Sequence, residues 1–149
     1  MDKAPDFSKS HIRKMVKLFS ALHVFLYRLL GGRLVGGKGT VMLLTTTGRK
    51  SGLARTKPVM YLEEGEAIYC VASRAGSAKH PLWYKNLVKT PQVTVEVMGR
   101  GPQTRTARTA SDEERTDLWP RLVATYADFD TYQRLTERAI PVVVLDKLA

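Results

Sequence analysis

Short strand-like segments recur through the chain and determine the kind of fold that it can adopt. Each is rich in β-branched residues or alternates polar with apolar side chains, and turns or helical stretches separate them. Their ranges are 41–47, 58–64, 67–73, 92–98, 103–110 and 139–146. A Glu-Gly turn between the second and third segments predicts a hairpin. About six mainly antiparallel strands with inserted helices predict an α+β domain around a small barrel.

Three helical stretches are predicted after the first strands. Pro81 is well placed to open a short helix up to Pro91, after a loop over 74–81. Ser111 with Glu114 forms a capping-box pattern at the start of a helix over 111–127. Pro120 lies inside that stretch and should kink the helix or divide it in two. A short helix over 128–138 follows.

An amphipathic helix is predicted over residues 9–30, before the first strand, ending at Gly31 and Gly32. Its first half is basic, and apolar residues at three- and four-residue spacing share one face. They are Ile12, Val16, Phe19, Leu22, Phe25 and Leu29. Two interpretations stay open and are compatible. The helix docks on the domain by its apolar face, or it lies on an anionic bilayer. We therefore expect an N-terminal helix and linker over 1–37 and a barrel domain over 38–149.

Positive charge is concentrated in the N-terminal half of the chain. The net charge is +10, and no acid occurs between Asp6 and Glu63. Arg49, Lys50 and Arg55 lie with Lys57 in a glycine-containing turn, which suits a phosphate or carboxylate ligand. A solvated hairpin tip is the alternative. The turn has neither P-loop nor dinucleotide spacing. Because no helix-turn-helix, zinc or RNP pattern appears, we expect no nucleic-acid partner.

Two further segments contain candidate site residues. Residues 73–87 form a small-residue loop that runs into a helix N-terminus, which is a natural anion site. Tyr126, Phe129 and Tyr132 occur at three-residue spacing on one helix face, which indicates either core packing or the lid of a pocket. The three His residues are far apart and lack Cys or carboxylate at ligand spacing, so no metal site is expected.

Other features favour a cytoplasmic protein. The single Cys70 lies in an apolar strand, where a buried core position is expected, and it excludes a disulfide framework. No apolar run is long enough to predict a membrane span, and the N-terminus makes a poor signal peptide.

Three blocks of the sequence resemble the deazaflavin-dependent nitroreductase family of actinobacteria. They are LLTTTGRKSGLARTKPVMY, GSAKHPLWYKNLVKTPQVTVEV and DEERTDLWPRLVATYADFDTYQRLTERAIPVVVL. The resemblance extends from about residue 38 through nearly the whole remaining chain, in the same order. It implies a split β-barrel similar to flavin-binding proteins of the pyridoxamine-phosphate oxidase type. It also implies coenzyme F420, an 8-hydroxy-5-deazaflavin, as the cofactor.

The resemblance assigns the coenzyme to particular positions. The basic turn would hold the phosphate and oligoglutamate tail, and the other segments would line the deazaflavin. The implied residues are Arg49, Lys50, Ser51, Arg55, Thr56, Lys57, Pro58, Val59, Met60, Val71, Ala72, Ser73, Arg74, Leu82, Trp83, Tyr84, Lys85, Asn86 and Phe129.

The implied reaction is hydride transfer from the reduced coenzyme to a quinone, an enone or a nitroaromatic compound. Tyr132, Ser73 or Tyr126 would supply or relay the accompanying proton. The chain has Phe129 where nitroimidazole-activating relatives have tyrosine, and Met60 where they have an aromatic residue. We expect coenzyme binding to survive both differences, but nitroimidazole activation is in doubt.

Two rival functions remain. One is an FMN-dependent oxidoreductase of the same fold, and the other is a non-catalytic protein that binds the deazaflavin. Because split barrels of the flavin type often pair, a homodimer is expected. The basic helix further suggests attachment to the inner face of the cell membrane, where menaquinone would be the acceptor.

Overall fold

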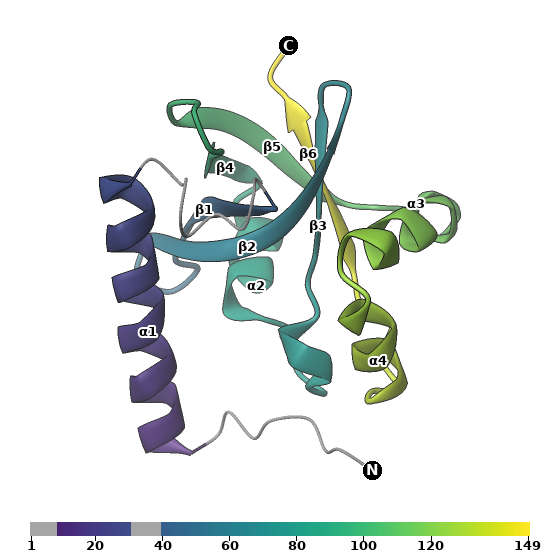
Figure 1. The fold of residues 1–149 in the computed structure, drawn as a ribbon, viewed down its shortest axis with the longest axis horizontal. Coiled ribbons are helices and arrows are strands. Elements are labelled where there is room, and N and C mark those ends of the chain that lie inside the picture. The colour runs from purple at the N-terminus through teal and green to yellow at the C-terminus, as the bar shows by residue number, and fades with distance from the viewer. Residues whose placement is uncertain (1–8, 31–39) are drawn as a thin grey trace.

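The computed structural model describes residues 9–30 and 40–149, which form a barrel surrounded by helices (Figure 1). The six strands of this described part close in the order β1-β2-β3-β6-β5-β4, and every pairing is antiparallel. Their bounds are β1 Val41–Thr47, β2 Ala54–Glu64, β3 Ala67–Val71, β4 Gln92–Glu96, β5 Gln103–Thr109 and β6 Val142–Lys147. The predicted α+β fold around a small barrel, the split β-barrel, is confirmed.

The barrel is filled by side chains from alternate positions of its strands. In β6, Val143 and Leu145 point into the barrel, while Val142 and Val144 pack on its outer side under helices. Both faces of β6 are therefore buried, which explains its unbroken apolar run. Cys70 lies in the barrel interior with no exposed surface, as predicted, and burial raises its thiol pKa to about 12.

Three α-helices and one 3-10 turn follow β3 in the chain. They are η2 Arg74–Gly76, α2 Leu82–Lys89, α3 Asp112–Thr125 and α4 Asp128–Arg134. The predicted capping box at the start of α3 is present: Ser111 Oγ accepts from the Glu114 amide, and the Glu114 carboxylate accepts from the Ser111 amide. Of the two predicted effects of Pro120, a kink or a division of the helix, the division is wrong, because α3 continues through this residue. Thr116, whose carbonyl loses its helical partner, is exposed, so water can satisfy that group.

Strand β2 begins four residues earlier than predicted. It pairs with β1 from Thr47 opposite Ala54 onward, and the Thr45 and Thr56 hydroxyl oxygens lie 2.8 Å apart across this pair. The segment from Ala54 to Lys57 lacks apolar alternation, so its sequence did not predict a strand. The basic stretch is therefore a short turn followed by the start of a strand.

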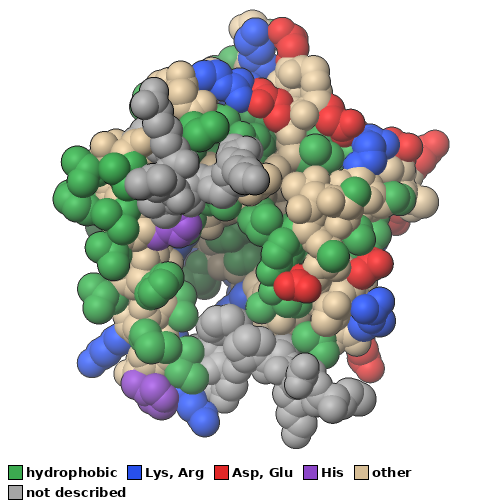
Figure 2. All heavy atoms as spheres, in the orientation of Figure 1, with side chains coloured by type: hydrophobic (Ala, Val, Ile, Leu, Met, Phe, Trp, Pro, Cys, Tyr) green, Lys and Arg blue, Asp and Glu red, His purple; other side chains and the backbone are tan. Residues whose placement is uncertain are grey.

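Helix α1 (Ser10–Leu29) stands beside the barrel and contacts it through a few residues (Figure 1). Tyr27, 3% exposed, donates a hydrogen bond to the Glu96 carbonyl at 3.2 Å, and Arg28 forms an ion pair with the Glu96 carboxylate at 2.7 Å. The expectation that α1 docks by its apolar face is wrong. Most of that face is exposed, including Phe19 at 72% and Phe25 at 61% (Figure 2). Gly31, Gly32 and the predicted domain boundary after residue 37 lie outside the described residues.

Candidate active site

The turn between β1 and β2 is closed by two backbone hydrogen bonds. The Gly48 amide donates to the Leu53 carbonyl at 2.7 Å, and the Gly52 amide donates to the Gly48 carbonyl at 2.8 Å. Gly52 has a φ of +71°, which favours glycine, and a Cβ at Gly48 would lie 2.6 Å from Ser51 Oγ. The two glycines therefore permit a tight turn that presents Arg49 and Lys50.

Side chains of helix α2 hydrogen-bond to this turn and hold its backbone in place. Asn86, 5% exposed, donates from Nδ2 to Thr46 Oγ1 at 3.0 Å and accepts from the Arg49 amide at 3.1 Å. Lys89 Nζ donates to the Arg49 carbonyl at 2.7 Å. The backbone of Arg49 is thus held at both its donor and its acceptor.

The cations of the turn have no carboxylate partner in the described part of the chain. Arg49, Lys50, Arg55 and Lys57 are absent from its ion pairs, all of which lie elsewhere. Lys57 is half-buried on β2, and its pKa is lowered by burial, by Lys17 of α1 and by Arg55, in that order. A cluster of uncompensated cations that lowers a lysine pKa is suited to an anionic ligand.

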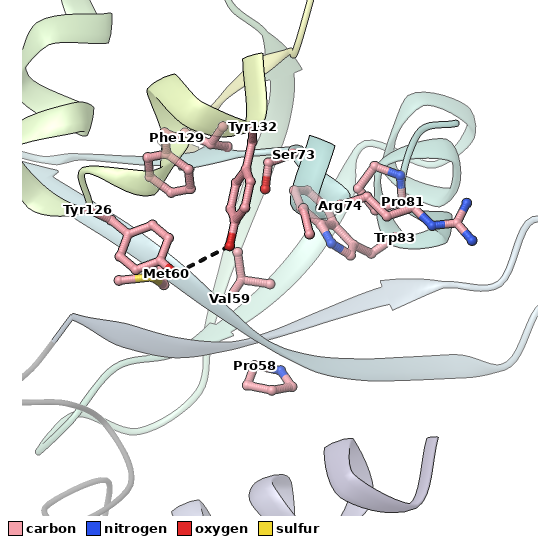
Figure 3. A pocket seen from close by; sticks show the side chains of 12 residues that line it. Pro58, Val59, Met60, Ser73, Arg74, Pro81, Trp83, Tyr126, Phe129 and Tyr132 are labelled. Carbon is pink, nitrogen blue, oxygen red and sulfur yellow. Dashed lines mark hydrogen bonds between the residues drawn. The ribbon is translucent and has the colours of Figure 1, made fainter. Parts of the chain in front are cut away.

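A cavity of about 350 Å³ opens beside β2, between the barrel and the α3–α4 side (Figure 3). This volume lies in the range of about 300–1,000 Å³ typical of small-molecule sites. Its lining comes from β2, the end of β3, the η2 loop, the start of α2, and the segment around α4. The residues are Pro58, Val59, Met60, Val71, Ser73, Arg74, Ala75, Pro81, Trp83, Tyr126, Phe129 and Tyr132.

The sequence pointed to all of these lining residues except Ala75 and Pro81. Both are small or apolar and have no chemical signature of a site, but each adjoins a predicted residue in the chain. The three proposed proton donors, Ser73, Tyr126 and Tyr132, all line the same cavity. Ser73 is far in sequence from the two tyrosines, so the fold has brought it to the cavity that they line.

The other predicted coenzyme residues lie outside the cavity. Arg49, Lys50, Ser51, Arg55, Thr56 and Lys57 form the turn and the start of β2, and Ala72, Leu82, Tyr84, Lys85 and Asn86 adjoin the lining segments. Ala72 is fully buried, and the Tyr84 hydroxyl lies 2.9 Å from Thr109 Oγ1. Asn86 is buried behind the turn with both ends of its amide bonded to protein. Its position indicates support of the turn.

Two phenols face each other at the cavity wall. The hydroxyl oxygens of Tyr126 and Tyr132 are 3.3 Å apart, and the dashed line in Figure 3 marks the hydrogen bond between them. Hydrogen bonding to Tyr132 and then to Asp128 raises the pKa of Tyr126 well above its ordinary value. This hydroxyl is therefore protonated at neutral pH and can donate. Phe129 is nearly buried beside them, with its ring centroid 5.1 Å from that of Tyr126.

Polar residues missed by the sequence analysis hold α4 in place. The Gln133 side chain accepts from Arg115 at 2.7 Å and from the Ile140 amide at 2.9 Å, and it donates to the Arg138 carbonyl at 2.9 Å. Trp119 Nε1 donates to Asp130 at 2.8 Å. The residues joined by these bonds are up to 18 positions apart in sequence, so no local pattern signals them.

The turn and the cavity lie along the same strand. Arg55 and Met60 are both on β2, and five residues of extended chain span about 17 Å. The arrangement therefore suits an extended ligand with a flat apolar part in the cavity and anionic groups at the turn. Among residues 9–30 and 40–149, no cluster of ligating side chains could hold a metal ion. No helix within the same ranges has the length and apolar character needed to cross a bilayer.

Comparison with known proteins gives consistent matches. The family model described as F420H(2)-dependent quinone reductase matches residues 20–147. An F420H(2)-dependent quinone reductase of Mycobacterium tuberculosis (strain ATCC 25618 / H37Rv) is 36% identical over 135 residues, covering 85% of this chain and 88% of the relative.

Two solved structures agree with these sequence matches. The structure of an F420-H2 dependent reductase, FDR-A, is 40% identical with a TM-score of 0.66, covering 72% of this chain and 94% of that one. A second structure, described as a domain-swapped dimer, is 35% identical with a TM-score of 0.68, covering 85% and 97% of the two chains.

Proposed function

This chain belongs to the F420H(2)-dependent quinone reductase family, and on that premise we propose that its cavity is the site of quinone reduction. The protein is an F420H2-dependent oxidoreductase, and its cofactor is coenzyme F420. The observation that most supports the placement is the continuity of an unpaired cation cluster with an apolar cavity along β2. We propose that its acceptors are quinones, enones and nitroaromatic compounds.

The residues present fit the coenzyme. Its phosphodiester and carboxylates need several fixed cations, and Arg49, Lys50 and Arg55 supply them without competing carboxylates in the described residues. Burial and then repulsion from Lys17 and Arg55 lower the Lys57 pKa, and an anion bound there would offset that repulsion. Val59, Met60 and Trp83 offer apolar surface for a flat ring. When bound in its reduced form, the coenzyme supplies a hydride from carbon.

The protein side of the reaction is proton supply and exclusion of water. Reduction of a quinone to a hydroquinone takes up one hydride and one proton. Hydride addition leaves an oxyanion, so one proton must reach that oxygen. The hydroxyls of Tyr126 and Tyr132 lie within hydrogen-bonding distance of each other in the lining of the cavity, and Ser73 lines the same cavity (Figure 3). We assign Tyr132 as the donor, with Tyr126 relaying a proton to it.

Acceptor choice is proposed to depend on Met60 and Phe129. Both side chains line the cavity, and neither offers a hydrogen-bond donor. A site without donors at these two positions favours an apolar quinone or enone over a nitroimidazole. We also propose that this site reduces nitroaromatic compounds.

The exposed face of α1 supports peripheral attachment to the inner face of an anionic membrane. Phe19, Phe25 and Leu29 are more than half exposed, and the preceding turns contain Lys9, Arg13, Lys14 and Lys17. Apolar side chains that insert among lipids beside cations that contact anionic headgroups give an interfacial helix. Such attachment would bring the cavity close to a quinone dissolved in the membrane.

A homodimer is also part of the proposal. A relative at 35% identity is described as a domain-swapped dimer, which supports self-association of this chain. Light scattering during size-exclusion chromatography should give about twice the mass of 16.7 kDa. A monomer mass at micromolar concentration would contradict the dimer without affecting the catalytic proposal.

A fluorescence titration with oxidised coenzyme F420 tests the placement of the cofactor. We expect micromolar or tighter binding to the wild type, at least tenfold weaker binding to Lys50→Ala and Arg55→Ala, and no competition by FMN. Lys147→Ala is the matched control. It removes an exposed cation at 62% side-chain exposure, paired with Glu66 and outside the turn.

The same titration separates the rival functions. Tighter binding of FMN than of F420 would favour the FMN-dependent enzyme. Tight F420 binding without turnover across a panel of quinones and enones would favour the non-catalytic binding protein. Undiminished binding in both turn variants would place the anionic part of the coenzyme elsewhere.

A further inference from the structure

We infer that Arg138 is a positioning residue: it holds the Ser73–His80 loop against α4 and thereby sets the position of Ser73 in the lining of the cavity that it shares with Tyr132. The inference concerns how the site is kept in shape and, for its kinetic readout, rests on the proposed function. Arg138 itself does not line the cavity.

The Arg138 guanidinium binds four groups of the loop. It donates to the carbonyls of Ser77 at 2.8 Å, of Ser73 at 2.8 Å and of Ala72 at 3.3 Å. It also lies 3.1 Å from His80 Nδ1. Each of these partners is uncharged, and they are 58 to 66 residues away in sequence. A planar fork of five N–H donors can reach all of them at once, whereas a lysine ammonium cannot.

The loop needs such support because its backbone is in a conformation that side chains disfavour. Arg74 and Ala75 have φ values of 46° and 49°, in the left-handed region, although neither is glycine. Strained backbone of this kind persists when surrounding contacts fix it, and it clusters at functional sites. Ser73, Arg74 and Ala75 all line the cavity, so the strained residues are the ones that shape it.

The contact with His80 defines the state of that ring. An arginine always donates, so His80 Nδ1 must accept, which leaves the proton of the neutral ring on Nε2. Burial and then the neighbouring Arg138 and Lys85 lower the His80 pKa, which agrees with a neutral ring. The Arg74 guanidinium, which donates to the His80 carbonyl at 3.4 Å, and the Tyr84 ring, 4.9 Å away, also adjoin it.

Arg138 is also hydrogen-bonded to α4. The Arg138 carbonyl accepts from Gln133 at 2.9 Å, and Gln133 belongs to α4 together with Tyr132. Gly76 of the loop approaches α4 so closely that a Cβ would lie 2.8 Å from the Tyr132 carbonyl and 2.9 Å from Leu135 Cβ. Arg138 and Gly76 therefore fix how the loop packs against α4 through two independent sets of contacts.

The first test is hydrogen exchange, which needs no coenzyme. The amides of Gly76 and Ser77 donate to the Ser73 and Arg74 carbonyls at 3.1 and 3.0 Å within the loop. In Arg138→Lys, we expect these amides to exchange at least tenfold faster than in the wild type, while barrel amides stay protected. Arg134→Lys is the control, because Arg134 is exposed and its guanidinium bonds only the Thr131 hydroxyl among the described residues. Unchanged exchange in Arg138→Lys would overturn the inference even if the protein binds no coenzyme.

The second test is a double-mutant cycle on turnover. Arg138→Lys should lower kcat at least tenfold and weaken F420 binding by a smaller factor, because the basic turn, which is proposed to hold the anionic part of the coenzyme, does not contact Arg138. In a Ser73→Ala background the same change should cost less than threefold, because the group being positioned has gone. Equal losses in both backgrounds would indicate general destabilisation and overturn a positioning role.

Gly76→Ala provides a second route if Arg138→Lys is poorly folded. It leaves the guanidinium intact but forces the loop and α4 apart, so it should also lower kcat with little change in F420 affinity. A wild-type kcat in Gly76→Ala, with a normal melting temperature, would show that the packing of the loop against α4 does not affect turnover. This result would contradict the inference. Failure of the wild type to bind F420 would instead refute the proposed function.

Discussion

Tyr132 offers the sharpest residue-level test of the proton path. Its hydroxyl is 3.3 Å from that of Tyr126, and both line the cavity. Because a positioned proton donor contributes about 10²–10⁴-fold, Tyr132→Phe should lower kcat for a quinone at least 10²-fold. F420 affinity should stay unchanged, as measured by fluorescence.

The control for this change is Tyr69→Phe. Tyr69 packs against the same outer core but does not line the cavity, so its hydroxyl should be dispensable. Equal kcat values for wild type and Tyr132→Phe would exclude Tyr132 as the donor and direct attention to Ser73.

Asn86 is expected to matter through the turn that it holds. Asn86→Ala leaves Thr46, 2% exposed, and the Arg49 amide without their partner, which costs about 1–3 kcal/mol of unfolding free energy. Urea denaturation should show this loss, and F420 should bind at least tenfold more weakly. Thr109→Val removes only the exposed hydrogen bond to Tyr84 and serves as the control. Wild-type F420 affinity in Asn86→Ala would show that the turn keeps its shape unaided.

At the level of single residues, the sequence pointed to hydroxyl-bearing side chains whose catalytic roles stay predictions. Ser73, Tyr126 and Tyr132 bear reactive hydroxyls in recognisable blocks, and all three line the cavity. Asn86 was predicted as a coenzyme contact, and its role in bonding the turn was not visible. The role of Arg138 was missed altogether, because its partners are 58 to 66 residues away and an isolated arginine has no signature.

Among the elements, α1 shows that a hydrophobic pattern can predict a helix without predicting which of its residues contact the barrel. Its periodicity correctly predicted a helix, but Tyr27 and Arg28, off the apolar face, make the contacts with the barrel. Periodicity reports which residues share a face and not what that face contacts. Strand β2 shows the opposite failure: its first residues are polar, and pairing with β1 extends the strand beyond its apolar pattern.

The exposed face of α1 gives a prediction about membranes. A Phe19→Ser/Phe25→Ser double variant should bind vesicles containing phosphatidylglycerol at least tenfold more weakly than the wild type, because it loses inserted apolar surface. Sedimentation with vesicles measures this. Since both side chains are exposed, the melting temperature should change little.

Leu148→Ser is the control for this experiment, because it removes an apolar side chain that is 46% exposed and not part of α1. Wild-type binding should also weaken at high salt and on vesicles of phosphatidylcholine alone. Vesicle binding that survives both the double variant and deletion of residues 1–30 would refute attachment through α1.

For the whole molecule, stability should fall at acid pH in two steps. The His80 pKa is lowered below its ordinary value of 6.5, so the unfolded chain takes up this proton first and stability declines as pH falls below about 6.5. The Glu114 pKa is lowered to about 2 by Arg108 and Ser111, so its contribution is lost as pH falls from its ordinary value of 4.5 towards 2.

Urea denaturation between pH 8 and pH 3 measures both steps. His80→Gln should flatten the first step and leave the second, because glutamine does not titrate. The second step should be small, since Glu114 is exposed and its ion pair is screened by solvent. An unchanged decline between pH 6.5 and 5 in His80→Gln would assign that step to another group.

The position of β6 in the barrel bears on how the protein is made. β6 pairs with β3 on one side and β5 on the other, so the sheet stays open between those strands until Val142–Lys147 has been synthesised. A nascent chain without β6 therefore presents two strand edges with unpaired backbone groups, together with the apolar surfaces that β6 later covers. Nascent polypeptides at this stage are targets for chaperones, and truncation before residue 142 should yield an aggregating product instead of a shorter domain.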